Sequence, residues 1–397
     1  MKIAVLTCGM LPIPAVQGGA VENLIDFYLE YNDTYKLYDI TIYSPWNDKI
    51  TNHLALLSDV NNYVFIDVTS IKARIARKLR CFFHSDSNEY YNYFIEYYFE
   101  KVYVDLKKKE YDFILLENGA GLAYKLSQRG VKNIILHMHN EVRQSRAKFH
   151  HAIFNNITKI ITVSDYIKGK ASSLFPIDKI ETVHNGIDLN NFTRKTEPSV
   201  NRQQIGFDEN DFVMVYSGRI NKEKGVSELI DAMLMLKDMP NIKLMIIGGT
   251  FFGNTDNEDE FVYSLKNKAK TIEQKIIFTG FIPYHEMPDY LQMADIAVIP
   301  SIWDDPFPTT VLEAQAMALP IITTKRGGIP EEATEENAIL LDTDEHFVDH
   351  LANAILDLYH YPEKRKQMSN ASLQRSKFFD KATYAKSFFA VLGEVQL

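Results

Sequence analysis

Two acidic residues eight positions apart, Asp305 and Glu313, are the strongest candidates for chemistry in this sequence. A Pro-Phe-Pro-Thr-Thr turn between them opens into a helical pattern, with Asp304 or Asp305 expected at its mouth and Glu313 about two turns inside. A helix N-terminus has unpaired N–H groups and partial positive charge, which suit a phosphate, and an inward carboxylate can accept hydrogen bonds from two vicinal hydroxyls. The pair therefore predicts a nucleotide-sugar site; the alternative is an N-cap and a solvated acid.

Short apolar runs flank this acidic pair. Residues 296–300 precede it and residues 320–324 follow it, and both runs are typical of strands buried in a parallel sheet. The acids then lie on a strand–loop–helix–strand unit, at the carboxyl end of a strand, where open α/β sheets bind ligands. This context favours a ligand site over an isolated helix cap.

A basic loop follows another predicted strand, residues 213–217. Gly218 allows a tight turn after it, and Arg219 and Lys224 can then converge on one diphosphate, the first as a planar fork and the second as a point charge. A solvated basic loop is the alternative. The loop is a phosphate-binding candidate because it follows a predicted buried strand, as the acidic pair follows residues 296–300.

Two glycine turns end the next strands along the chain. Gly249 follows residues 243–247, where paired glycines allow a ligand to approach the backbone. Gly280 follows residues 276–279 and leads into Phe281 and Ile282, which offer backbone groups and an apolar wall to a flat base. Plain turns are the alternative at both places.

The first half of the chain has its own candidates. Gly18 and Gly19 lead from the first strand into a helix, which favours backbone contact with an anion. His137 and His139, followed by Asn140, end a predicted strand and are expected on the acceptor side. Two histidines at this spacing are also candidate metal ligands, but the neighbouring sequence offers no evident third ligand, so a structural histidine is the other interpretation.

Composition narrows the class of protein. The chain has 397 residues and a net charge of −9, which argues against general nucleic-acid binding. Its only cysteines, Cys8 and Cys81, do not form a disulfide framework, so a reducing cytoplasm is the expected location. The amino-terminal apolar run predicts a strand rather than a signal peptide, and no stretch approaches the roughly 20 apolar residues needed to cross a bilayer.

Apolar runs alternate with helical patterns, which predicts α/β architecture with parallel sheets. Polar residues 194–204 separate two sets of six strands, so we expect one domain over residues 1–195 and a second over 196–397, facing across a cleft. The final helix, from about residue 380, either stays on the second domain or crosses back to the first. The predicted strands are residues 3–6, 39–43, 63–66, 113–116, 133–137, 159–163, 213–217, 243–247, 276–279, 296–300, 321–324 and 338–341.

The sequence resembles the retaining glycosyltransferases of family 4, which have the GT-B fold of two Rossmann-like domains. Five pieces carry the resemblance in order and spacing: SGRINKEKG, LMIIGG, IIFTGFIP, ADIAVIPS and DPFPTTVLEAQAMALPIITT. The last resembles the family's E-x7-E motif. Here the first Glu is replaced by Asp305 and the usual following Gly by Pro308, which has no N–H to donate. These two departures leave the identity of the donor sugar open.

The resemblance implies a role for each candidate. Arg219 and Lys224 would bind the donor diphosphate, and Glu313 the ribose hydroxyls. Asp305 would face the donor sugar, and His139, with His137 as the alternative, would bind a sugar hydroxyl or the acceptor. The remaining donor residues implied are Gly18, Gly19, Gly249, Phe281, Ile282, Phe307, Pro308, Thr309 and Thr310.

The implied activity is transfer of a hexose from a nucleotide diphosphate sugar, with UDP favoured, to a glycan or polyprenyl-diphosphate-linked acceptor in surface polysaccharide biosynthesis. The resemblance implies no metal and no cofactor. A non-catalytic nucleotide- or sugar-binding protein on the same fold is one alternative, because fold does not fix function. A phosphorylase of GT-B fold is another.

Residues 70–83 predict a basic amphipathic helix. Ile71, Ile75, Leu79 and Phe82 fall at helical spacing, and cations occupy the other face. Such a helix can lie on an anionic membrane surface, which would place the protein at the inner face of the cell membrane. An ordinary surface helix packed on its own domain is the alternative.

Overall fold

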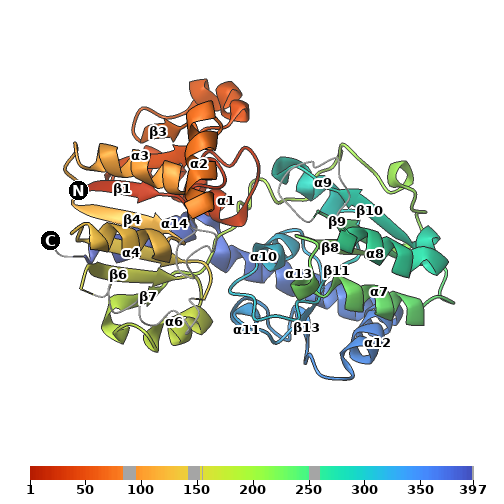
Figure 1. Cartoon of the computed structure of the whole chain (residues 1–397). Coiled ribbons are helices and arrows are strands. Elements are labelled where there is room, and N and C mark those ends of the chain that lie inside the picture. The colour runs from red at the N-terminus through yellow and green to blue at the C-terminus, as the bar shows by residue number, and fades with distance from the viewer. Residues whose placement is uncertain (84–94, 142–152, 154, 250–259, 396–397) are drawn as a thin grey trace. The chain divides into compact units, whose positions relative to one another are not determined.

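The structure is a computed structural model that describes residues 1–83, 95–141, 153, 155–249 and 260–395 (Figure 1). The chain forms two compact units. Met1–Asn185 and Ala382–Leu397 make the first, and Gly186–Lys381 makes the second. Each unit is built on its own parallel sheet, as the alternating apolar and helical patterns predict.

The sheet of the first unit has seven strands among the described residues, in the order β3-β2-β1-β4-β5-β6-β7. All neighbouring pairs are parallel. The central strands are buried on both faces, since every residue of β4 and β5 is buried. The strands are β1 (Lys2–Leu6), β2 (Asp39–Pro45), β3 (Asn62–Ile66), β4 (Phe113–Glu117), β5 (Ile134–Met138), β6 (Ile157–Thr162) and β7 (Ile180–Thr182).

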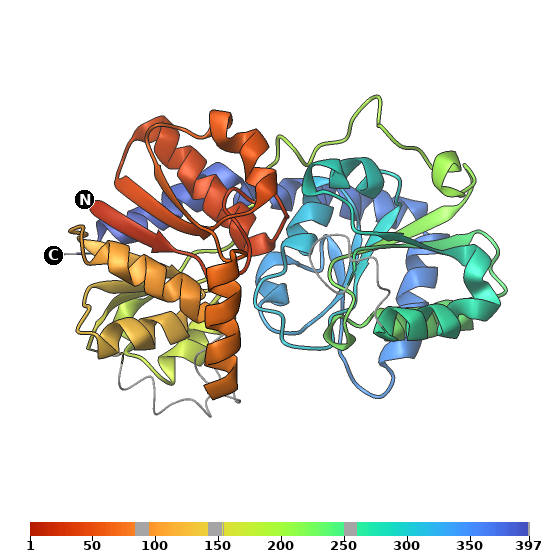
Figure 2. The ribbon, with the colours of Figure 1, turned by 45° about the horizontal axis from the view of Figure 1, so that its top comes forward.

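The helices of the first unit include one from the far end of the sequence. The Tyr28 ring on α1 stacks on Phe388 of α14 with centroids 4.5 Å apart, and Figure 2 shows the red α1 near the blue α14. The sequence left open whether the last helix stays on the second domain or crosses back to the first. In the structure it belongs to the first unit. The helices are α1 (Ala20–Tyr35), α2 (Ile71–Phe83), α3 (Glu96–Leu106), α4 (Ala120–Gln128), α6 (Asp165–Ser172) and α14 (Lys381–Gly393).

The sheet of the second unit has six parallel strands within the described part of the chain, in the order β10-β9-β8-β11-β12-β13. The order reverses at the pair β8–β11, which places the loops after these two strands next to each other. The strands are β8 (Phe212–Ser217), β9 (Ile242–Ile247), β10 (Ile276–Gly280), β11 (Ile296–Ile299), β12 (Ile321–Thr324) and β13 (Ala338–Leu341).

Helices of the second unit bury their apolar faces against this sheet. Leu229 and Ile230 of α7 and Leu351 and Ile355 of α12 are fully buried in one hydrophobic cluster. The helices are α7 (Val226–Met235), α8 (Glu260–Ala269), α9 (Met287–Leu291), α10 (Thr309–Ala316), α11 (Ile329–Glu332), α12 (Phe347–His360) and α13 (Pro362–Ser376).

The units divide at residue 185, ten residues before the boundary expected from the sequence. The polar segment 194–204 suggested a linker, but its side chains and backbone are bonded to the second unit. Arg194 Nε donates to the Met317 carbonyl at 3.1 Å, and Lys195 N donates to Gln292 Oε1 at 2.9 Å. Polar composition alone did not distinguish such a segment from a free linker.

Each of the twelve predicted strands coincides with an observed one within one or two residues at either end. The three-residue β7 was missed because it is too short to give an apolar run. None of the helices traced in the described ranges combines the length and apolar content needed to span a bilayer. Cys8 carries a free thiol.

Candidate functional site

Three glycine turns meet at the carboxyl ends of β8, β9 and β10. Gly218 N donates to the Ile247 carbonyl at 3.0 Å, and Gly248 N donates to the Gly280 carbonyl at 2.8 Å. A Cβ atom on Gly248 would lie 2.0 Å from the Gly218 carbonyl oxygen, so no side chain fits there. Gly249 continues this contact, because its carbonyl accepts from Ile220 N at 2.9 Å. The predicted turns therefore form one connected edge.

The basic loop after β8 lies against the loop after β11. Asn221 caps its short 3-10 turn by accepting from Lys224 N at 3.2 Å. A Cβ on Gly225, whose φ is 70°, would lie 1.8 Å from the Pro300 carbonyl oxygen, so the loops are in direct backbone contact. Lys224 Nζ forms an ion pair with Asp305 and lies 5.7 Å from the centroid of the Trp303 ring. The structure thus joins two predicted donor residues.

Arg219 is exposed at the start of the same loop. Its carbonyl accepts a hydrogen bond from the Tyr216 hydroxyl at 2.6 Å, which fixes the backbone where the loop leaves β8. Burial raises the pKa of Tyr216, and the nearby Asp305 carboxylate raises it further. The Tyr216 hydroxyl therefore stays protonated and holds the Arg219 backbone at neutral pH.

Asp305 lies before α10 and does not cap it. The helix begins at Thr309 with Pro308 as its N-cap residue, and no side-chain cap hydrogen bond is formed there among the described residues. The alternative interpretation of Asp304 or Asp305 as an N-cap is therefore wrong, because three residues separate Asp305 from the first turn. The Asp305 carbonyl instead accepts from Gly328 N at 2.7 Å, which ties it to the turn after β12.

Glu313 lies one turn inside α10 rather than the expected two, because the helix begins at Thr309. It is only 6% exposed, and Thr309 Oγ1 lies 3.4 Å from its Oε1. Burial raises the pKa of Glu313 to about 8, so the carboxyl is mostly protonated at neutral pH. The interpretation of Glu313 as a solvated helix residue is wrong.

The predicted residues around α10 differ in what they expose. Phe307 is buried, with its ring 5.7 Å from that of Phe379, so its side chain packs inside the unit. Thr310 Cγ2 would lie 3.8 Å from a Cβ on Gly218, so the first turn of α10 lies beside the β8 turn. Phe281 and Ile282 are half-buried after β10.

Two residues of the second unit were missed by the sequence reasoning. Burial raises the pKa of Tyr284 well above its usual range, and Glu313 in its ionised form raises it further, so this phenol lies near the diol-binding candidate. Glu332 is fully buried, neither carboxylate oxygen has a hydrogen-bond partner in the described part of the chain, and burial and the Asp305 charge raise its pKa. Tyr284 follows the predicted Gly280 turn, which was the available signal.

In the first unit, Gly18 and Gly19 precede α1 with φ values of 74° and 116°. A Cβ on Gly19 would lie 2.1 Å from Glu22 Oε2, and the φ of 116° is itself one that favours glycine. Burial raises the pKa of Glu22 to about 7, with a further contribution from Glu117. The predicted anion-binding turn therefore has a buried acid beside it, which the sequence reasoning missed.

His137 and His139 lie against a third residue, Glu117 at the end of β4. His139 Nε2 is 2.8 Å and His137 Nδ1 is 2.9 Å from Glu117 Oε2, and all three residues are buried. Asn140 is exposed. The sequence next to the two histidines offered no third candidate ligand. Glu117, on the neighbouring strand β4, provides this third side chain because it pairs in register with His137.

These three residue types can bind a metal, and their ligand atoms lie within 4.8 Å of one another. Around a tetrahedral zinc ion with bonds near 2.0–2.1 Å, ligand atoms would lie about 3.3 Å apart. The two nitrogen–oxygen distances, 2.8 and 2.9 Å, are instead those of hydrogen bonds and ion pairs. The geometry favours a polar network, and the expectation of no metal stays a prediction.

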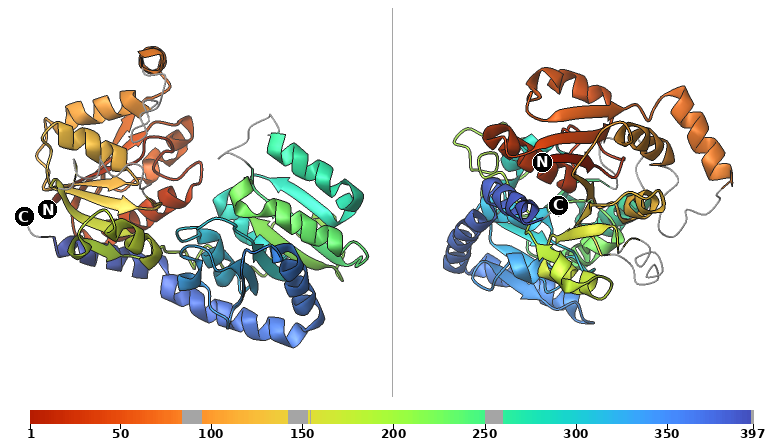
Figure 3. Two further views of the ribbon diagram at one scale, coloured as in Figure 1. Left: turned by 60° about the horizontal axis from the view of Figure 1, so that its bottom comes forward. Right: turned by 90° about the vertical axis from the view of Figure 1, so that its left-hand side faces the viewer.

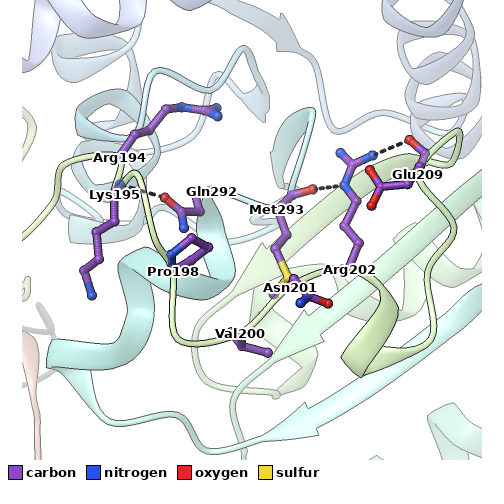
Figure 4. Close-up of a pocket in the computed structure, with 9 residues that line it drawn as sticks. All are labelled: Arg194, Lys195, Pro198, Val200, Asn201, Arg202, Glu209, Gln292 and Met293. Carbon is purple, nitrogen blue, oxygen red and sulfur yellow. Dashed lines mark hydrogen bonds between the residues drawn. The ribbon is translucent and has the colours of Figure 1, made fainter.

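A cavity of 310 Å³ lies elsewhere in the second unit, between residues 194–202 and the turn at Gln292 and Met293 (Figure 4). Arg202 spans it by donating to the Met293 carbonyl at 2.8 Å and to Asp295 Oδ2 at 3.0 Å. Asp295 precedes β11, so this cavity is at the amino ends of the strands, opposite the glycine turns. Its three cations, Arg194, Lys195 and Arg202, are used in structural bonds.

The chain is similar to known proteins in both sequence and fold. A model of the family described as "Glycosyl transferases group 1" matches residues 199–375. YtcC of Bacillus subtilis (strain 168), whose name places it among glycosyltransferases, is 30% identical over 354 residues, or 85% of this chain and 78% of that relative. A GDP-mannose-dependent monoacylated alpha-(1-6)-phosphatidylinositol monomannoside mannosyltransferase of Corynebacterium glutamicum is 26% identical over 288 residues, 67% of this chain and 72% of that protein.

Among solved structures, HepE of Anabaena in complex with UDP-glucose has a TM-score of 0.73 and 19% identity, with 99% of each chain covered. The two parallel α/β units are thus those of the GT-B fold, as the sequence predicted. The chain belongs to the group 1 glycosyltransferases.

Proposed function

We propose that the chain is a retaining, metal-independent hexosyltransferase that uses a nucleotide diphosphate sugar. One observation carries this proposal: the second unit brings Lys224, Asp305, the first turn of α10 and Glu313 to one edge of its sheet. The cation and the helix N-terminus suit the diphosphate, and the carboxyl group suits the ribose diol. Arg219, on the same loop as Lys224, completes the phosphate-binding set.

The proposed reaction breaks the bond between the sugar C1 and the diphosphate oxygen. The acceptor hydroxyl attacks C1 from the same face, and its proton passes to the departing phosphate, so the products are the glycosylated acceptor and the nucleoside diphosphate. Arg219 and Lys224 stabilise the charge that develops on the leaving group, a role often worth about 3 kcal/mol per group. Asp305 faces the donor sugar.

UDP is the favoured nucleotide. The support is the similarity of the whole fold to HepE, whose structure contains UDP-glucose. The Corynebacterium relative is named as GDP-mannose-dependent, so GDP is the principal competitor. Phe281, Ile282 and Tyr284 are the residues that we expect to distinguish the two bases.

We propose a glycan or polyprenyl-diphosphate-linked acceptor in surface polysaccharide synthesis, reached at the inner face of the membrane. Support comes from α2, which projects from the edge of the first unit in both views of Figure 3. Its apolar stripe faces solvent: Ile71 is 75%, Ile75 54% and Leu79 54% exposed. Ala73, on another face, packs inward, at 2% exposure. This arrangement disfavours the interpretation of α2 as an ordinary helix packed by its apolar face.

The test is a thermal-shift screen of the full chain against UDP, GDP and dTDP, followed by transfer and hydrolysis assays with the matching sugars. We expect stabilisation by UDP and release of UDP from at least one UDP-sugar. Binding of UDP without release from any donor would favour the non-catalytic alternative. Release that requires inorganic phosphate, with a sugar phosphate as product, would favour the phosphorylase.

A further inference from the structure

A buried polar cluster in the first unit has a carboxylate at its centre. Glu117 is 1% exposed, and its two oxygens have different partners. Oε1 accepts from the Tyr28 hydroxyl at 3.0 Å, whereas Oε2 lies 2.8 Å from His139 Nε2. The Tyr384 hydroxyl, from α14, is buried and has no hydrogen-bond partner among the described residues. A charged acid in such surroundings is costly unless its neighbours favour its ionised form.

The two histidines contact this carboxylate differently. His137 Nδ1 lies 2.9 Å from Oε2, but neither ring nitrogen of His137 makes a well-formed hydrogen bond within the described chain. His139 Nε2 does make one. His139 also lies one residue beyond the end of β5, where its strand opens into a loop. Of the two, His139 is the histidine whose ring orientation Glu117 controls.

The protonation states follow from the same contacts. Burial opposes ionisation of Glu117, but His137 and His139 together lower its pKa well below the usual range, so it is a carboxylate. Burial and, to a smaller extent, the nearby His137 outweigh the opposing effect of Glu117 and lower the pKa of His139 to about 4, so its ring is neutral near pH 7. A carboxylate can only accept a hydrogen bond; the neutral ring must therefore carry its proton on Nε2.

We propose that Glu117 is a positioning residue that holds His139 in the Nε2–H tautomer, so that Nδ1 is left as a hydrogen-bond acceptor for a sugar hydroxyl. This inference rests on the proposed transferase function for its consequence, although the tautomer itself does not. The described residues supply no hydrogen bond to Nδ1, which is consistent with a free acceptor. The alternative tautomer would present an N–H at Nδ1 and leave Nε2 with a lone pair facing the carboxylate, which is repulsive.

The first test is spectroscopic. Full-length protein labelled with 15N-histidine gives long-range proton–nitrogen correlations that distinguish the two neutral tautomers, and the signals of His139 are those lost in His139→Asn. We expect the Nε2–H tautomer at pH 7 in the wild type. An Nδ1–H tautomer or an imidazolium at His139 would overturn the inference without any variant of Glu117.

Three variants then connect the tautomer to the reaction. Glu117→Leu removes the acceptor, and we expect loss of the Nε2–H preference together with a fall in kcat of at least tenfold and an unchanged Kd for UDP. Glu117→Gln should rescue both readouts, because its amide oxygen can accept from Nε2 while its NH2 group donates to the Tyr28 hydroxyl. Tyr28→Phe is the matched control: it removes the partner of the other oxygen and should leave the tautomer intact.

Other outcomes are equally decisive. A wild-type kcat in Glu117→Leu, with or without the tautomer change, would refute the positioning role. A wild-type protein with the expected tautomer that transfers no sugar would refute the proposed function but leave the assignment of the hydrogen bond in place. The spectroscopic measurement therefore tests the tautomer of His139, and the kinetic measurement tests the proposed function independently of it.

Discussion

Lys224 and Asp305, 81 positions apart in the sequence, form an ion pair where β8 and β11 end side by side. Their side chains are 18% and 6% exposed, so the pair is largely shielded from water. Burial raises the pKa of Glu332 well above its usual range, and the nearby Asp305 carboxylate raises it further. Before the donor binds, the cation that we assign to its diphosphate is thus already neutralised by the acid that we assign to its sugar.

This pairing gives Asp305→Asn opposite effects on two ligands. The amide cannot hold Lys224 as an ion pair, so the cation becomes available to phosphate, and we expect the Kd for UDP to stay the same or fall. The interaction with the sugar is lost, so kcat/KM for transfer should fall by about a hundredfold or more, as for a missing charge-assisted contact. Calorimetry with UDP and a transfer assay measure the two effects. A weaker Kd for UDP would contradict this division of roles.

Arg219→Ala should raise the Kd for UDP by about tenfold or more, because a hydrogen bond to a charged group contributes about 1.5–3 kcal/mol. Lys222→Ala is the matched control, since Lys222 is an exposed cation on the same loop. Both variants remove one positive charge, so a general electrostatic effect would weaken binding equally in the two. Calorimetric titration at fixed salt distinguishes them, and equal losses would remove Arg219 from the phosphate site.

Glu313 makes the stability of the second unit depend on pH. Burial raises its pKa from 4.5 to about 8. Below pH 4.5 the group is protonated in both the folded and unfolded states. Between pH 4.5 and about pH 8, Glu313 is ionised in the unfolded state but protonated in the folded state. Unfolding therefore releases a proton, and the free energy of unfolding falls as pH rises. Above about pH 8 both states are ionised and the loss is constant.

Glu313→Gln removes this dependence. Relative to the wild type, its free energy of unfolding should increase between pH 5 and pH 8 by roughly 2–4 kcal/mol, because each pKa unit corresponds to about 1.4 kcal/mol. Urea unfolding at the two pH values measures the difference. Glu336→Gln, which changes an exposed acid of the same unit, should show almost none. A pH-independent difference for Glu313→Gln would mean that its carboxyl is not protonated when folded.

Much of the fold was predictable because apolar runs bounded by glycine and polar turns mark buried parallel strands. The ends of β8 and β11 could be assigned from sequence, and so could the grouping of Lys224 with Asp305 at one sheet edge. The start of α10 could not, because Asp305 resembles a cap and only the backbone after Pro308 decides the question. Glu117 was missed because it meets His139 through strand pairing, 22 positions away in the sequence.

Gly225→Ala tests whether backbone contact holds the basic loop in place. The φ of Gly225 is 70°, which disfavours any residue with a Cβ. A new Cβ would also lie 1.8 Å from the Pro300 carbonyl oxygen, which is a steric clash. Gly280→Ala is the control, since φ is 73° but no atom lies within 4 Å of the new Cβ. We expect Gly225→Ala to lower the free energy of unfolding by roughly 2–4 kcal/mol more than the control does. If urea unfolding shows the same decrease in the free energy of unfolding for both variants, the contact between Gly225 and Pro300 does not contribute to stability.

The membrane proposal predicts that α2 contributes to vesicle binding through both its charges and its apolar stripe. Neutralising Lys72, Arg74, Arg77 and Lys78 together should reduce binding to vesicles containing anionic lipid by at least tenfold, because each cation near such a surface contributes about 1 kcal/mol. Ile75→Ser with Leu79→Ser should reduce binding at high salt as well, where charge attraction is screened. Co-sedimentation measures both effects.

The matched control for charge is neutralisation of residues 107–109, three exposed lysines just beyond α3 in the same unit. If binding depends only on total charge, this variant will lose affinity in proportion to the charges removed. If α2 is the docking element, the variant will bind nearly as well as the wild type, because its lysines lack an exposed apolar stripe such as that of Ile75 and Leu79 on α2. If both α2 variants bind vesicles as well as the wild type does, α2 is an ordinary surface helix and not a membrane-binding element.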